Sequence, residues 1–106
     1  MTDLAQRWID ALRSGQFAQG RYCLRDQDDT YCCLGVFCQI SGQGKWEIRQ
    51  NRWAYSALDE SSYNLIPPKL TNLAGLTVNQ MFTLTKMNDG GKTFAEIADH
   101  LEEILQ

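Results

Sequence analysis

The sequence predicts an α+β domain in which helices dominate. Amphipathic helical patterns occupy both ends of the chain, whereas two short aromatic segments near the middle are typical of strands. The chain lacks the strand–helix–strand alternation that builds a parallel sheet. Its 106 residues, 43% of them apolar, are enough for one modest core without metals or disulfides. We therefore expect residues 1–106 to form a single domain with a small antiparallel β element between the helices.

The first helix is expected over Asp3–Arg13. Asp3 has a side chain suited to the N-cap, and Gln6 follows three residues later. Gly15 should end the helix together with Ser14, because glycine readily adopts the left-handed conformation found after helices. The apolar side chains recur at helical spacing on one face: Leu4, Trp8, Ile9 and Leu12.

A short hairpin is expected next. The alternation of Tyr22 and Leu24 predicts a strand, and residues 26–29 predict a turn, because aspartate side chains hydrogen-bond to nearby backbone. A second strand would run from Tyr31 to Cys32.

The most apolar run, residues 31–40, has two interpretations, because nearly every position is apolar at either period. We favour a buried helix from Cys33 to Ile40 that ends at Ser41 and Gly42. A fully buried central strand is the alternative. On a helix, Gly35 would allow another element to pack closely.

Short elements are expected in the middle of the chain. Residues 46–48 and 52–55 predict two strands joined by a turn at residues 50–51, whereas residues 59–62 predict a loop. Pro68 is suited to the first position of a short helix. That helix would carry the leucines Leu70, Leu73 and Leu76.

The C-terminal segment predicts two helices, starting after Thr77 and Thr93. Each threonine is followed three residues later by Gln80 or Glu96, which is the pattern of a capping box. One face of the first helix should carry Val78, Met81, Phe82 and Thr85. The apolar face of the second should carry Phe94, Ile97, Ala98, Leu101, Ile104 and Leu105. The core is expected to be built from Trp8, Leu12, Phe37, Met81, Phe82, Phe94, Ile97 and Leu101.

Charge and composition exclude several function classes. The net charge of −3 argues against broad binding to nucleic acid or to anionic membrane. All six arginines lie within residues 1–55. This part of the chain carries a charge of +1, whereas residues 56–106 carry −4. A local anion-binding patch in the first half is therefore compatible with the negative net charge. Neither a signal peptide nor an apolar run of about 18 residues is present. We expect a cytoplasmic protein.

The cysteines do not have the pattern of a metal site. Their spacing, C-x8-C-C-x4-C, lacks the paired knuckles of a zinc ribbon, and the only histidine, His100, is far away in the sequence. In a reducing compartment we expect buried thiols that act as small apolar side chains. The sequence accordingly predicts no metal, no cofactor and no assignable catalytic residue.

Two segments are candidates for binding. Arginines interleaved with tryptophans can grip a partner or stack on a nucleotide, and they occur at Lys45, Trp46, Arg49, Arg52 and Trp53. The alternative is that the tryptophans cover the core while the arginines lie on the surface. A weaker candidate is Asn88 with Asp89, whose oxygens could contact a ligand. Those two residues also suit a helix ending before Gly90 and Gly91, so the functional interpretation competes with a purely structural one.

The chain resembles a group of small uncharacterised proteins found in phage and prophage genomes. The matching residues are Trp8-x3-Leu12-x-Ser14-Gly15-x-Phe17-x-Gln19, Tyr31-Cys32-Cys33-Leu34-Gly35-Val36-x-Cys38, Leu73-x2-Leu76-Thr77 and Leu84-x2-Met87-Asn88-Asp89-x-Gly91-x2-Phe94-x2-Ile97-Ala98-x3-Glu102. Residues 43–66 carry little of the resemblance. It implies an accessory protein that acts in the bacterial cytoplasm during infection, and it brings no established activity.

The function expected from these observations is that of a non-enzymatic phage accessory protein. It would bind and inhibit a host protein, such as one of antiviral defence, by analogy with other small phage proteins. One alternative is a small-ligand binder that sequesters a nucleotide signal. Another is a small hydrolase or thiol enzyme that uses Asp89, His100 or a cysteine. Tryptophans exposed on the surface would also favour a homodimer.

Overall fold

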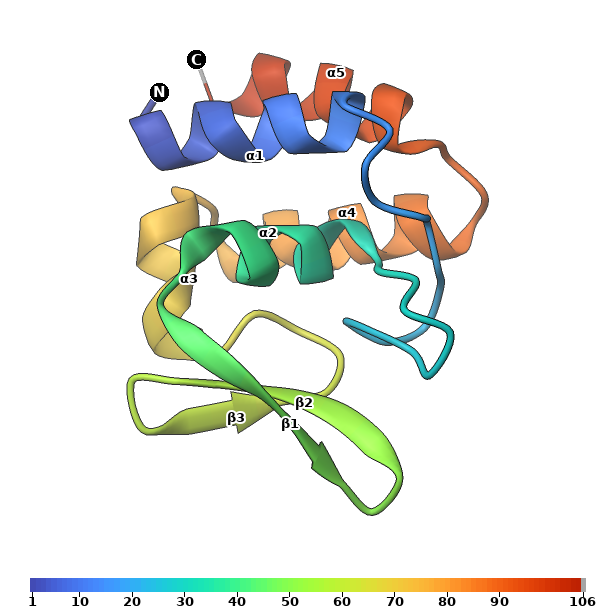
Figure 1. The fold of residues 1–106 in the computed structure, drawn as a ribbon. Coiled ribbons are helices and arrows are strands. Elements are labelled where there is room, and N and C mark those ends of the chain that lie inside the picture. The colour runs from blue at the N-terminus through green and yellow to red at the C-terminus, as the bar shows by residue number, and fades with distance from the viewer. Residues whose placement is uncertain (106) are drawn as a thin grey trace.

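The computed structural model describes residues 1–105 and forms a helix-dominant α+β domain, as predicted. The helices within these residues are α1 (Asp3–Arg13), α2 (Cys33–Ser41), α3 (Pro68–Ala74), α4 (Val78–Asp89) and α5 (Phe94–Ile104). The strands are β1 (Gly44–Arg49), β2 (Arg52–Ala57) and β3 (Glu60–Ser62). Figure 1 shows α1 beside α5 in one layer, α2 and α4 in the next, and the sheet beyond α2. Across residues 1–105, every helix is too short or too polar to span a bilayer.

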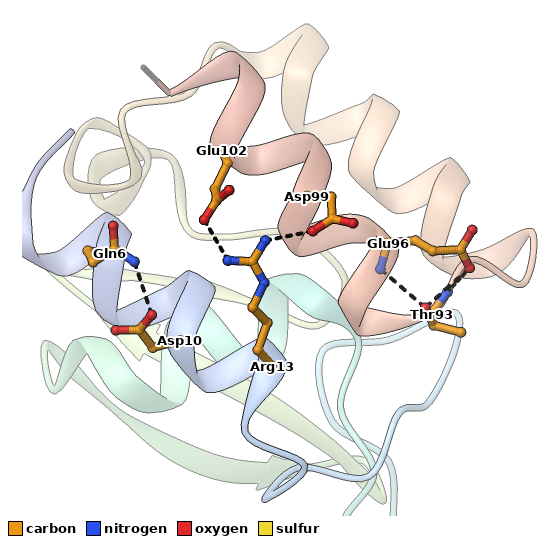
Figure 2. Close-up of polar contacts among 7 residues, drawn as sticks. All are labelled: Gln6, Asp10, Arg13, Thr93, Glu96, Asp99 and Glu102. Atoms are coloured by element: carbon orange, nitrogen blue, oxygen red, sulfur yellow. Dashed lines mark hydrogen bonds and ion pairs between the residues drawn. The ribbon is translucent and has the colours of Figure 1, made fainter.

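Helix α1 has the predicted bounds but a different cap. The Thr2 hydroxyl accepts a hydrogen bond from the backbone N of Ala5 at 3.0 Å, so Asp3 already belongs to the first turn. Figure 2 shows the ion pairs at the C-terminal end of α1, where the Arg13 guanidinium nitrogens lie 2.6 Å from a carboxylate oxygen of Asp99 and 2.5 Å from one of Glu102 on α5. The ion pairs are exposed, so packing between the two helices contributes most of the attachment.

The strand predicted at Tyr22 and Leu24 is absent. Tyr22 has a left-handed φ of 72°, its side chain is 70% exposed, and only single β-bridges join Gln19 and Arg25 to Tyr31. The backbone N–H and carbonyl of Leu24 instead form hydrogen bonds with residues outside a strand pair. The Leu24 N–H donates to the Tyr63 carbonyl at 2.8 Å, and its carbonyl accepts from Cys32. The second strand, expected from Tyr31 to Cys32, is likewise reduced to these bridges.

The run at residues 33–41 is the buried helix that we favoured, and the strand alternative is wrong. Helix α2 ends at Gly42, which has a left-handed φ of 65°. The indole N–H of Trp8 donates to the Cys33 carbonyl at 2.9 Å, which ties α1 to the start of α2. Gly35 confirms the expected close approach: a Cβ there would lie 1.9 Å from the Leu24 carbonyl oxygen.

The sheet has the order β1-β2-β3 and is antiparallel throughout. Gln50 and Asn51 form the predicted turn, with left-handed φ values of 53° and 64° that suit a two-residue hairpin. The loop predicted at residues 59–62 is wrong, because Glu60–Ser62 forms β3. A second two-residue turn, at Leu58 and Asp59, reverses the chain with φ values of 53° and 68°.

The C-terminal helices have both predicted capping boxes, and Pro68 opens α3 as expected. The predicted face of α4 is correct at Met81, which is buried, and wrong at Val78 and Phe82, which are 57% and 47% exposed, so Phe82 does not belong to the core. The other buried positions on α4 are Leu84 and Asn88. The predicted core positions on α5 are buried, namely Phe94, Ile97, Ala98 and Leu101, while Ile104 and Leu105 are half-buried.

Candidate functional site

The strand register divides the five predicted binding residues between two faces of the hairpin. Side chains alternate along a strand, so Trp46 and Ile48 share the face on which β2 places Tyr55 and Trp53. Lys45 and Arg49 point to the opposite face. They line an open hollow of about 450 Å³ over the outer side of the sheet, together with residues from β2 and β3.

Trp46 is part of an aromatic cluster that closes the core. Its ring centroid lies 5.0 Å from that of Tyr55 and 6.0 Å from that of Tyr31, in edge-to-face geometry. The indole N–H donates to the Gln39 side chain at 2.7 Å. Trp46 is therefore a covering residue of the core, in line with the structural alternative considered for the tryptophans.

Arg25 is a residue of this region that the sequence interpretation missed. Its guanidinium carbon lies 3.9 Å from the centroid of the Trp53 ring, and within 6 Å of the rings of Tyr31 and Trp46. Nη2 lies 2.7 Å from a carboxylate oxygen of Asp29, and the side chain is only 17% exposed. A cation over an indole face in a partly desolvated site is favourable by about 1–2 kcal/mol. Arg25 thus holds Trp53 in one orientation.

A groove runs along the edge of this stack, which we call the Arg52 groove. It consists of two adjacent hollows of about 300 and 220 Å³, which share the residues Arg25, Gln27, Asn51, Arg52 and Trp53. The larger hollow extends to Ile48 and Asp29, and the smaller to Cys23 and Asp26. The Gln27 amide donates to the Asn51 carbonyl at 2.7 Å, so the loop and the hairpin turn are joined across the groove.

Arg52 lies at the entrance to β2 and is exposed to solvent. Its guanidinium stacks over Tyr63, with 4.5 Å between the guanidinium carbon and the ring centroid. Nη2 donates to the Asn64 side chain at 3.2 Å. Among the residues that the structure describes, no carboxylate lies within ion-pair distance of Arg52. Arg52 and Trp53 therefore line the same groove, whereas Lys45 and Arg49 line the other hollow, although Arg49 is the cross-strand partner of Arg52.

Asn88 lies in the interior with all its bonds directed to the protein. Its Oδ1 accepts hydrogen bonds from Gln19 Nε2 at 2.9 Å and from the Cys33 N–H at 3.2 Å. Its Nδ2 donates to the Gly20 carbonyl at 2.8 Å. Gln19 also bonds the Lys92 carbonyl, at 2.7 Å, and the Phe94 N–H, at 3.1 Å. This network joins three segments of the chain around the C-terminus of α4.

The Asp89 side chain, the other member of the weaker candidate pair, is half-buried. Its Oδ1 accepts from the Tyr22 N–H at 2.9 Å, which holds the loop that leads to Arg25. Asn88 and Asp89 therefore act together on the placement of residues 19–22. One signal in the sequence could have identified this role. Asn88 follows Met81 by seven residues, which places both side chains on the same, buried face of α4.

The thiols are held in their neutral form. Burial raises the pKa of Cys32 to about 11 and raises the pKa of Cys33 and Cys38 well above the usual range. Burial also raises the pKa of the half-buried Cys23. All four cysteines are free, and in residues 1–105 no cluster of three histidine, cysteine or acidic side chains is arranged to hold a metal ion. A thiol nucleophile needs the opposite shift in pKa.

Comparison with known proteins places the whole described domain in one family. A family model with the description "Domain of unknown function (DUF8296)" matches residues 1–105. The chain belongs to this family. No curated protein and no solved structure matches the chain. The DUF8296 match spans the hairpin as well as the helices, so the Arg52 groove and the Asn88 network both lie within the family's domain.

Proposed function

We propose that this DUF8296 protein is a non-enzymatic binding protein whose hairpin end docks on a partner protein. The observation that supports the proposal most directly is Ile48, an isoleucine that is 64% exposed at the end of β1. It lies opposite Trp53 in the strand register, beside the Arg52 groove. Figure 1 shows that this end of the hairpin projects away from the helices.

The composition of this end is that of an interaction hot spot. Tryptophan and arginine are enriched where partner proteins contribute most of their binding free energy. Trp53 is fixed beneath Arg25, so little side-chain entropy would be lost when a partner covers it. Ile48 adds apolar surface that is largely exposed to solvent in the described chain.

The partner is proposed to be a host protein in a bacterial cytoplasm, with a protein of antiviral defence as one case. The support is the resemblance to small phage and prophage proteins. An activated thiol is not available, since burial raises the pKa of every cysteine. Inhibition would then follow from covering a functional surface of the host protein, without chemistry on it.

The proposal is tested by comparing Ile48→Glu with Val78→Glu. Val78 is a matched control, because it is 57% exposed and also apolar but lies on α4. Both variants should keep the melting temperature of the unsubstituted protein within a few degrees, since exposed substitutions change stability by about 0.5 kcal/mol. In affinity capture from host lysate, a host protein retained by the unsubstituted chain and by V78E should be lost with I48E.

Two results would contradict the proposal. A host protein that V78E loses and I48E retains would move the docking surface to the face of α4. Capture that is equal for all three proteins would show that neither exposed apolar side chain takes part.

A further inference from the structure

The Arg52 groove contains one cation, Arg52, whose hydrogen-bonding capacity the described residues leave largely unused. Asp29 is paired with Arg25 at 2.7 Å. Asp26 accepts hydrogen bonds from the N–H groups of Asp28 and Thr30, at 2.9 and 3.1 Å, and from the Thr30 hydroxyl. The hydrogen bond from the Thr30 side chain lowers the pKa of Asp26, so this carboxylate is stabilised within its own loop. Among the described residues neither Asp26 nor Arg52 has an ion pair, but Asp26 accepts three hydrogen bonds from its own loop, whereas the Arg52 guanidinium donates one, to Asn64.

Arg52 is also oriented before any partner binds. The Tyr63 ring supports one face of the guanidinium, and Asn64 accepts one of its five N–H donors. The other donors remain for a partner, and the fixed planar fork matches the geometry of a carboxylate. A lysine at this position would supply the charge but not the fork.

We propose that Arg52 binds a carboxylate side chain on the partner protein, while an apolar residue beside that carboxylate packs against Ile48 and Trp53. The inference rests on the proposed docking function and names the partner segment: an exposed acidic residue next to an apolar one. A hollow of about 300 Å³ beside Ile48 has room for one or two side chains. Charge complementarity is the reason for the choice of carboxylate.

A nucleotide fits the groove less well. A polyphosphate carries several negative charges, and in this groove it would approach the carboxylates of Asp26 and Asp29 as well as Arg52. The indole face of Trp53 on which a base could stack is occupied by Arg25 at 3.9 Å. A single carboxylate brings one negative charge near these aspartates instead of several, and it needs no free indole face.

The test uses a display library of random eight-residue peptides selected on the intact protein, with Arg52→Gln for counter-selection. Peptides that enrich on the unsubstituted protein should carry Glu or Asp beside an apolar residue. The best peptide and its Glu→Gln (or Asp→Asn) analogue are then titrated by fluorescence polarisation against the unsubstituted protein, R52Q, R52K and R49Q. Arg49 is the matched control, because it is the exposed cross-strand partner of Arg52 but pairs with Glu47 at 3.3 Å and lines the other hollow.

Loss of a hydrogen-bonded charge pair should weaken binding about tenfold or more in R52Q. R52K should be intermediate, R49Q unchanged, and the amide analogue should bind the unsubstituted protein and R52Q equally. The melting temperature of each variant is measured to show that it is folded.

The proposal is overturned if no acidic sequence is enriched, or if R52Q binds the acidic peptide as tightly as the unsubstituted protein does. It is also overturned if ATP displaces the peptide at lower concentration than free glutamate does, since the groove would then prefer a nucleotide. Selected peptides that depend on Ile48 but not on Arg52 would reject the carboxylate while leaving the docking function in place.

Discussion

Replacing Asn88 by alanine should lower the free energy of unfolding by about 1–4 kcal/mol. The substitution removes the hydrogen bonds to the Cys33 N–H, which is buried, and to the carbonyl of the half-buried Gly20. A buried group that loses its partner costs about 1–3 kcal/mol, and a group that water can reach costs about 1 kcal/mol or less. Gln19 loses a bond as well, but its side chain is exposed to water and adds little. Small domains have about 5–15 kcal/mol in total, so most of this range leaves a folded protein to measure.

The assay is urea denaturation followed by circular dichroism, with Asn79→Ala as the control. Asn79 is an exposed asparagine on the same helix, and its replacement should change stability by no more than about 0.5 kcal/mol. Asn88→Asp should cost at least as much as N88A, because it buries a carboxylate and places an oxygen in place of the donor to the Gly20 carbonyl. A loss below about 1 kcal/mol for N88A would refute the reasoning, since the network would then add little beyond what water supplies.

Two further predictions concern the groove and the thiols. Arg25→Met should cost about 1–2 kcal/mol of stability and shift tryptophan emission to the red, because Trp53 loses the guanidinium that covers it; unchanged emission would contradict the assigned role of Arg25. The stability of the domain should fall as pH rises from 9 towards 11. Over that interval the unfolded chain releases the Cys32 proton while the folded protein, in which the pKa is about 11, retains it. Cys32 contributes a loss of about 1.4 kcal/mol per pH unit, and the buried Cys33 and Cys38, whose pKa is also raised, add to it. Cys32→Ser should therefore make the profile less steep without flattening it, and a flat profile of the unsubstituted protein up to pH 11 would contradict the burial argument.

The parts of the fold that were predictable are those in which the determining interactions are local. The capping boxes at Thr77 and Thr93 satisfy backbone donors three residues away, so their pattern is visible in the sequence. The hairpin turn at Gln50 and Asn51 is similar, because the flanking strands are rich in aromatic residues and asparagine tolerates positive φ. These elements needed no knowledge of what packs against them.

The elements that were missed depend on partners that are distant in the sequence. Strand β3 follows a turn at Leu58, a residue type that rarely adopts a left-handed conformation, so the sequence gives no sign of it. The buried face of α4 includes the polar Asn88 together with Met81 and Leu84, and an apolar pattern alone assigns an asparagine to solvent. Arg25 reaches Trp53 only because a loop crosses the hairpin, and the spacing of 28 residues between them carries no local signal.

The long reach of the Asn88 network has a consequence for folding during synthesis. The bond from Gln19 to Asn88 spans 69 residues, and the bond from Cys33 to Asn88 spans 55. On the ribosome, residues 19–22 therefore emerge long before Asn88 and Asp89, and these bonds can form only when most of the chain has been translated. Arg25 is held by the nearby Asp29 and Tyr31, so its own contacts do not have to wait. A nascent chain that stalls before α4 would leave residues 19–22, which lead to the groove, without their anchors.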